Sequence, residues 1–79
     1  MPRLGLHNAD KEDLDHTLDA LEERNGEIME LPPGDQRAKY IKIATDIRRL
    51  IMDADVKHEK GASIIGNVIE IQRMMELLN

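Results

Sequence analysis

The segment Leu31-Pro32-Pro33-Gly34-Asp35-Gln36-Arg37 does most to limit how this chain can fold. Neither proline has an amide hydrogen and both have a fixed φ, so a helix that arrives from the N-terminal side must end here. Gly34 frees the backbone, and Asp35 is a favourable N-cap for a new helix. The segment therefore predicts one helix before residue 31 and another that begins near residue 35.

The composition indicates a small core built from aliphatic side chains. The chain has 79 residues with no Cys, Phe or Trp, and Tyr40 is its single aromatic residue. No disulfide or thiolate–metal site can stabilise such a fold. A chain of this length buries only about 60–65% of its unfolded surface. We therefore expect a single domain over residues 1–79 that forms an oligomer with copies of itself.

Hydrophobic spacing predicts an all-α fold in which an acidic helix precedes a helical hairpin. Residues 1–8 are expected to form a flexible leader, and Asp10 is expected to cap the acidic helix over 9–30. Its narrow apolar stripe consists of Leu14, Leu18, Leu21, Asn25 and Ile28. We favour an end near Gly26, since glycine commonly follows the last helical residue. If the helix continues, Asn25 lies on the stripe, where a buried Asn can fix register or oligomeric state.

The helical hairpin is expected over residues 35–79. Its first helix should run from about Gln36 to Ala54, and a turn is expected near Asp53–Lys57. The apolar stripe of this helix consists of Tyr40, Ile43, Ile47, Leu50 and Ala54. Either Asp55 or Ser63 is expected to cap the last helix.

The last helix, from Ala62 onward, is apolar on almost every side. One neighbouring helix cannot cover such a surface, so we expect it to form the contact between copies of the chain. The interface residues predicted on this basis are Ile64, Ile65, Val68, Ile69, Ile71, Met74, Met75 and Leu78.

Several classes of function have no support in the sequence. No apolar run approaches the roughly 18 residues of a transmembrane helix, and no signal peptide is recognisable, so we expect a cytoplasmic protein without a membrane partner. His7, His16 and His58 lie too far apart in the sequence for a metal site. No nucleophile has a base or an elbow motif near it. We expect no enzyme activity, no metal and no cofactor.

Charge is distributed unevenly along the chain, whose net charge is −5. Residues 1–31 contain three basic and nine acidic residues, whereas residues 32–61 contain seven basic and five acidic residues. Two interpretations remain open: an acidic helix lies beside a basic one, or the middle segment attracts an anionic ligand. The overall negative charge and the lack of a basic helix or stacking aromatics disfavour a nucleic acid polymer as partner.

The double-proline turn is the candidate ligand site. The free amides of a helix start can hold an anion. Gly34 lets the backbone approach a ligand, and Arg37 and Lys39 add positive charge. Gln36 can read a base edge and Tyr40 can stack on a base. Tyr40 also shares a stripe with core residues, however, which favours a role as a core anchor.

The spacing of several short motifs resembles a known family. These motifs are Pro32-Pro33-Gly34-Asp35-Gln36, Lys39-Tyr40 with Ile43, Leu50-Ile51, Glu59-Lys60 with Ala62, Ile69-Glu70 and Leu78-Asn79. Over residues 31–79 the chain resembles the helical hairpin of phage anti-CBASS and anti-Thoeris sponge proteins. The resemblance implies an oligomer, in the host cytoplasm, that binds a cyclic oligonucleotide or cyclic ADP-ribose without cleaving it. It implies that Gln36, Tyr40 and a neighbouring subunit's Lys60 contact the ligand, in addition to Gly34, Arg37 and Lys39 of the candidate site.

Three functional hypotheses follow. The first is a non-catalytic anti-defence protein that sequesters a cyclic nucleotide immune signal. The second is a small oligomeric protein-binding module, such as an inhibitor, chaperone or virion component, that uses its Ile- and Met-rich last helix. The third is an acidic inhibitor of a nucleic-acid-binding enzyme that uses residues 10–30.

Overall fold

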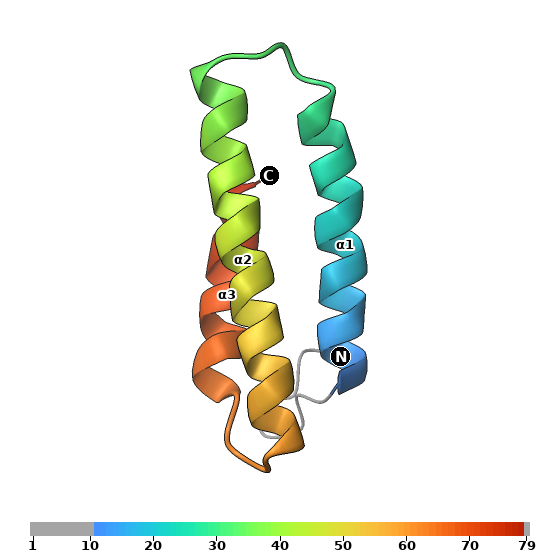
Figure 1. The fold of residues 1–79 in the computed structure, drawn as a ribbon, viewed down its shortest axis with the longest axis vertical. Helices are drawn as coiled ribbons and strands as arrows, with labels where there is room; N and C mark the ends of the chain where they lie inside the picture. The colour runs from blue at the N-terminus through green and yellow to red at the C-terminus, as the bar shows by residue number, and fades with distance from the viewer. Residues whose placement is uncertain (1–10, 79) are drawn as a thin grey trace.

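A computed structural model describes residues 11–78 of the chain. They form α1 (Lys11–Met29), α2 (Asp35–Glu59) and α3 (Ile65–Leu77), and no described residue is in a strand, which confirms the all-α prediction. Figure 1 shows α1 and α2 running in opposite directions, with α3 behind α2. None of these helices is long and apolar enough to cross a membrane. The predicted leader over 1–8 and the predicted Asp10 cap lie outside the described residues.

Helix α1 continues through Gly26 to Met29, so the predicted end near Gly26 is wrong. Leu21 and Ile28, on either side of Gly26, are fully buried. Burying one such side chain contributes about 1.5–3 kcal/mol, more than the roughly 1 kcal/mol that glycine costs inside a helix. The helix ends at Met29, and between it and Pro32 the amides of Glu30 and Leu31 donate to carbonyls three residues back at 3.1 and 3.0 Å.

Helix α2 begins one residue earlier than predicted, and its cap is different. Gly34 is the N-cap residue, with extended backbone, and its carbonyl accepts a hydrogen bond from Ala38 N at 3.0 Å. The prediction that Asp35 caps the helix is therefore wrong, because Asp35 lies in the first turn and no side chain caps the helix. Its carboxylate still complements the positive end of the helix dipole.

Helix α2 also continues past Asp53–Lys57, where a turn was predicted, and ends at Glu59. Ala54 is fully buried, and Lys57 and Asp53 form an ion pair at 3.0 Å across one turn. The true turn follows Lys60. Gly61 has φ of 76°, and the amides of Gly61 and Ala62 donate to His58 O and Lys57 O at 3.0 and 2.9 Å. This is a Schellman motif, which requires a left-handed residue and so favours glycine.

Neither of the two residues predicted to cap α3, Asp55 and Ser63, is its N-cap, so both predictions are wrong. Asp55 lies inside α2, so the expectation that it caps α3 is wrong. Ile64 is the N-cap residue, and its carbonyl accepts from Val68 N at 2.9 Å. Ser63 Oγ lies next to this start and accepts a long hydrogen bond, 3.4 Å, from Ile65 N.

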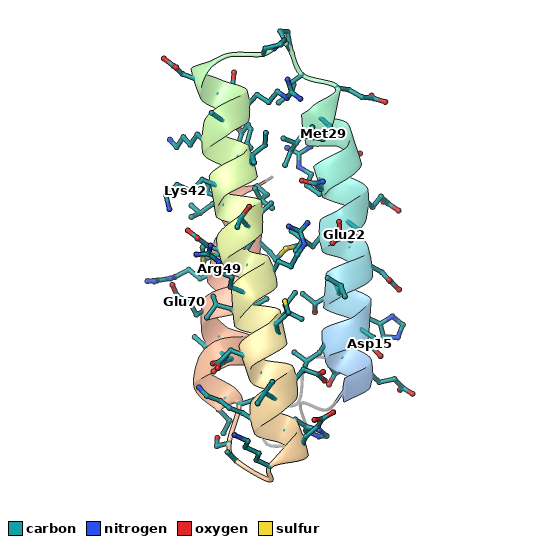
Figure 2. All side chains as sticks on the ribbon, viewed as in Figure 1. Asp15, Glu22, Met29, Lys42, Arg49 and Glu70 are labelled. Carbon is teal, nitrogen blue, oxygen red and sulfur yellow. The ribbon has the colours of Figure 1, made fainter. Side chains whose placement is uncertain are left out.

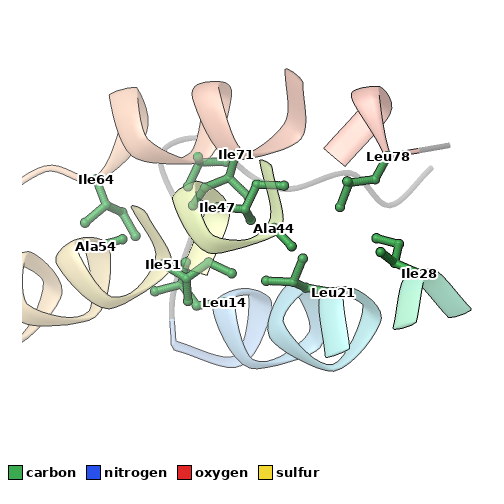
Figure 3. Packing of buried hydrophobic residues seen from close by; sticks show 11 residues of the cluster. Leu14, Leu21, Ile28, Ala44, Ile47, Ile51, Ala54, Ile64, Ile71 and Leu78 are labelled. Atoms are coloured by element: carbon green, nitrogen blue, oxygen red, sulfur yellow. The ribbon is translucent and has the colours of Figure 1, made fainter. Parts of the chain in front are cut away.

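One apolar stripe from each helix forms the core, which Figure 3 shows from close by. Its residues are Leu14, Leu21, Ile28, Ala44, Ile47, Ile51, Ala54, Ile64, Val68, Ile71 and Leu78. At 1.5 Å per residue, the 13 residues of α3 span about 20 Å and the 25 residues of α2 about 37 Å. The third helix therefore covers only part of the α1–α2 pair. The molecule measures 41 × 27 × 16 Å, so it is thin.

Candidate binding surfaces

The turn between α1 and α2 places five of the six predicted ligand residues at one end of the molecule. Gly34, Gln36 and Lys39 are exposed there, and Arg37 and Tyr40 are half-buried. Lys60 follows the other end of α2, about 37 Å away along the 25-residue helix. One chain therefore does not bring Lys60 to the turn, and only a neighbouring subunit could do so.

Arg37 is the least satisfied polar side chain at this end. Its Nη2 lies 3.8 Å from the sulfur of Met29, a weak acceptor. Its Nε is buried and has no hydrogen-bond partner. A guanidinium without a carboxylate partner retains its capacity to bind an anion through two parallel hydrogen bonds.

Tyr40 packs against the core, in agreement with its place on the apolar stripe. The guanidinium of Arg24 lies 5.9 Å from the centroid of its ring. Arg24 Nε donates to the carbonyl of Leu78 at 2.6 Å, and Arg24 Nη1 pairs with Glu27 at 2.8 Å. A base that stacked on Tyr40 would share the ring with Arg24.

The predicted interface on the last helix divides into inner and outer residues. Ile64, Val68, Ile71 and Leu78 are buried in the core of one chain, and Met74 and Met75 are half-buried against it. Only Ile65 and Ile69 are exposed, at 38% and 50%. Helix α3 packs on α2 and also reaches α1 through Leu78 and Arg24, so two neighbours share its apolar surface.

The helices also form a second surface that the sequence pattern does not predict. We call it the α1–α2 face: the side of these two helices that points away from α3 and toward the viewer in Figure 2. Its apolar residues include Leu18 and Met52, which line one hollow between the two helices, and Met29, which Figure 2 labels on α1. Met52 is 63% exposed and Met29 48% exposed. Met52 and Met29 lie off the stripes that predict burial, so periodicity did not single them out.

On the α1–α2 face, side chains of the two helices contact each other directly. At its centre Arg48 makes two hydrogen bonds to the carboxylate of Glu22, at 3.0 and 3.1 Å. Toward the start of α1, a hollow lies between the helices. It is lined by Leu14, Asp15, Leu18, Ile51, Met52 and Asp55.

The outer surfaces of α1 and α2 carry opposite charge. Four exposed acids follow one another every three or four residues along α1, and a fifth lies in the turn after it. None has an ion pair or hydrogen bond to any described residue: Glu12, Asp15, Asp19, Glu23 and Glu30. On α2, Lys39 and Arg49 are exposed and also make no ion pair within the described part of the chain. Figure 2 shows Lys42 and Arg49 on the flank of α2 that points away from α1.

Asn67 of α3 is a buried polar residue in the described chain, 7% exposed. Its amide nitrogen donates to Leu50 O at 3.1 Å and to Asp53 Oδ2 at 3.0 Å, and its oxygen accepts from Lys57 Nζ at 3.0 Å. The Asn67 hydrogen bond, followed by Lys57, lowers the pKa of Asp53 below its usual 3.8. The arrangement fixes α3 against α2 and favours an ionised Asp53, which is unsuited to donating a proton near neutral pH.

No group of His, Cys, Asp and Glu side chains in the described residues has the arrangement of a metal site. His16 and His58 are exposed on different helices, and His7 lies outside the described residues.

Comparison with protein-family models, with curated proteins and with solved structures found no match to this chain. The expected likeness to the phage sponge hairpin therefore rests on the residues quoted from the sequence.

Proposed function

We propose that this chain is a non-catalytic helical module that binds protein surfaces, and that the α1–α2 face is its main binding surface. The observation that carries the proposal is the exposure of Met52, 63%, beside a hollow lined by core leucine and isoleucine side chains. Exposed apolar side chains that adjoin a hollow and have charged neighbours are typical of an interaction site. Methionine suits this role because its flexible thioether adapts to the shape of a partner.

The exposed Ile65 and Ile69 of α3 form a second, smaller apolar patch. Of the interface predicted on the last helix, these are the residues still available to a partner. The same proposal therefore includes partner binding by α3. The exposed apolar surface of α3 is smaller than the sequence predicts, because most of the predicted interface residues are buried in the core.

Photo-crosslinking tests this proposal. A photoreactive phenylalanine analogue at position 52 should give light-dependent protein adducts in cells that express the chain. The matched control is the same analogue at position 73, because Arg73 is also exposed but lies on α3. Equal adduct yields at both positions, or no adduct at position 52, would contradict the proposal.

A second candidate function is the sequestration of a cyclic nucleotide at the α1–α2 turn, in the cytoplasm of a phage-infected cell. The observation that favours it is Arg37, whose buried Nε has no acceptor and whose Nη2 has only a methionine sulfur. Lys39 is exposed in the same turn of helix, and Gly34 leaves space beside the backbone. These groups have the chemistry that a phosphate needs.

A thermal-shift titration with cyclic dinucleotides, cyclic trinucleotides and cyclic ADP-ribose isomers tests the second candidate. A true ligand should raise the Tm of the wild type and the Tm of Arg49→Ala. It should not change the Tm of Arg37→Ala. Arg49 is a suitable control because it is a basic residue of α2 far from the turn. If no compound raises the Tm of the wild type at high micromolar concentration, the turn is not a nucleotide site.

A further inference from the structure

We infer that the α1–α2 face binds a second copy of this chain, with α1 of each copy lying on α2 of the other. This inference rests on the proposed function of the face as a protein interface and names its partner. The resulting dimer is two-fold symmetric and contains a four-helix layer, with the two α3 helices on its outer sides. The contact is isologous, so each pair of residues occurs twice.

The charges of the two helices support this arrangement. Helix α1 contains seven acidic and two basic residues, a net charge of −5. Within α2, the stretch from Arg37 to Arg49 contains five basic residues and one acidic residue, Asp46. Several of these charges are not satisfied within the chain, since Asp19, Glu23, Lys39 and Arg49 have no ion-pair partner among the described residues. A second copy can supply the missing partners.

Symmetry allows two ways to place the faces together, and the charges select one of them. A two-fold axis parallel to the helices lays each acidic α1 on the partner's α2. A two-fold axis across the helices lays α1 on α1, which brings like charges together and costs energy. The parallel axis also keeps each residue at its own height along the molecule. Arg48 and Glu22 define a common height, because they are hydrogen-bonded to each other.

The common position of Arg48 and Glu22 along the helix axes predicts which charges meet across the interface. Arg49 follows Arg48, and Asp19 lies one turn before Glu22, about 4.5 Å along the axis. Arg49 of one copy therefore lies opposite the partner's Asp19. Both side chains are exposed at the edges of the face, which is where the charged pairs of a four-helix contact lie.

The centre of the face is suited to close contact between helices. Leu18 and Met52 line the hollow, so they would lie between the two copies, and side chains of the partner would fill the hollow. Gly26 lies on the same side of α1 as Glu22 and Met29, and nothing surrounds the position of its missing side chain within 4 Å. The broad side of the molecule measures 41 by 27 Å, which is comparable to the roughly 800 Å² that each partner buries in a stable interface.

Sedimentation velocity over a concentration series tests the inference. We expect the wild type to sediment as a dimer that dissociates on dilution. Arg49→Glu should raise the dissociation constant at least tenfold, because it places two acids together twice per dimer. The combination of Arg49→Glu with Asp19→Arg should restore the constant to within about threefold of the wild type, since the pair is only exchanged. Circular dichroism should show the same helix content in every variant.

The matched control is Arg73→Glu, which makes the same change of charge on the exposed side of α3, away from the face. It should leave the dissociation constant unchanged. The inference is overturned if the wild type is a monomer throughout, if Arg73→Glu weakens the dimer as much as Arg49→Glu, or if the exchanged pair fails to recover. A monomer that still crosslinks another protein through position 52 would refute the second copy and leave the proposed function standing.

Discussion

Asn67 has the largest number of specific contacts of any single buried side chain described, since its amide contacts three groups of α2. A buried amide in an aliphatic core has a high cost unless it is hydrogen-bonded. Here the hydrogen bonds also fix the position of α3 along α2, because Leu50, Asp53 and Lys57 lie on successive turns. The sequence does not indicate this role, since nothing in the local pattern connects Asn67 with residues on another helix.

Replacing Asn67 tests this account. Asn67→Ala should lower the free energy of unfolding by about 1–3 kcal/mol, because the variant loses hydrogen bonds that have no substitute in the core. Urea unfolding followed by circular dichroism measures the change. The control is Gln72→Ala on the exposed side of α3, where we expect a change within about 0.5 kcal/mol. Equal effects at the two positions would show that the buried amide has no special role.

The lowered pKa of Asp53 predicts how stability depends on pH. Its pKa is lower in the folded state than in the unfolded chain, owing to Asn67 first and Lys57 second. Its contribution is therefore complete above the unfolded value of 3.8 and is lost as the pH falls through the folded value. We expect the wild type to lose more stability than Asp53→Asn as the pH is lowered from neutral into this range. Urea unfolding at a series of pH values tests this, and parallel curves would contradict it.

At the level of helices, the sequence predicts the elements better than their ends. The stop at Pro32-Pro33 and the start near Asp35 follow from local backbone chemistry, which the sequence shows directly. The continuation through Gly26 and past Asp53 depends on tertiary contacts: Ile28 reaches the core, and Asp53 and Lys57 reach Asn67. Such contacts override weak local signals for a helix end.

Two glycines should therefore respond in opposite ways to the same substitution. Gly26→Ala should stabilise the monomer by about 0.5–1 kcal/mol, since the position is helical and open. Gly61→Ala should destabilise it by about 1 kcal/mol, because φ at Gly61 is 76°. Thermal unfolding at a concentration low enough to avoid self-association measures both changes. Each variant is the control of the other, and shifts of the same sign would disprove the helix boundaries.

The binding surfaces, like the helix ends, are predictable from the sequence where they depend on neighbouring residues and not where they depend on tertiary contacts. The residues around the double proline lie together because they are neighbours in sequence, and this grouping was visible in advance. The separation of Lys60 from them was not, since it depends on α2 extending to Glu59. The α1–α2 face combines residues such as Leu18 and Met52 that lie far apart in the chain, so only the packed helices reveal it.

At the scale of the whole molecule, Arg24 connects all three helices. It lies on α1, stacks near Tyr40 of α2 and donates to the carbonyl of Leu78 after α3. Arg24→Ala should destabilise the fold by about 1–2 kcal/mol and should speed amide hydrogen exchange in the last turn of α3 more than in its first turn. Hydrogen exchange followed by mass spectrometry or NMR measures this. The control is Arg73→Ala, because Arg73 pairs only with Glu70 of its own helix.

The short third helix gives the two ends of the molecule different resistance to local unfolding. Near Ile47 and Ile51 a residue of α2 has helices on two sides, whereas the first turns of α2 lie beyond the reach of α3. Local opening costs least where the fewest apolar contacts must be broken. The double-proline end can therefore fray and close again while the rest of the core stays folded, so a molecule that binds there would act first by suppressing this fraying.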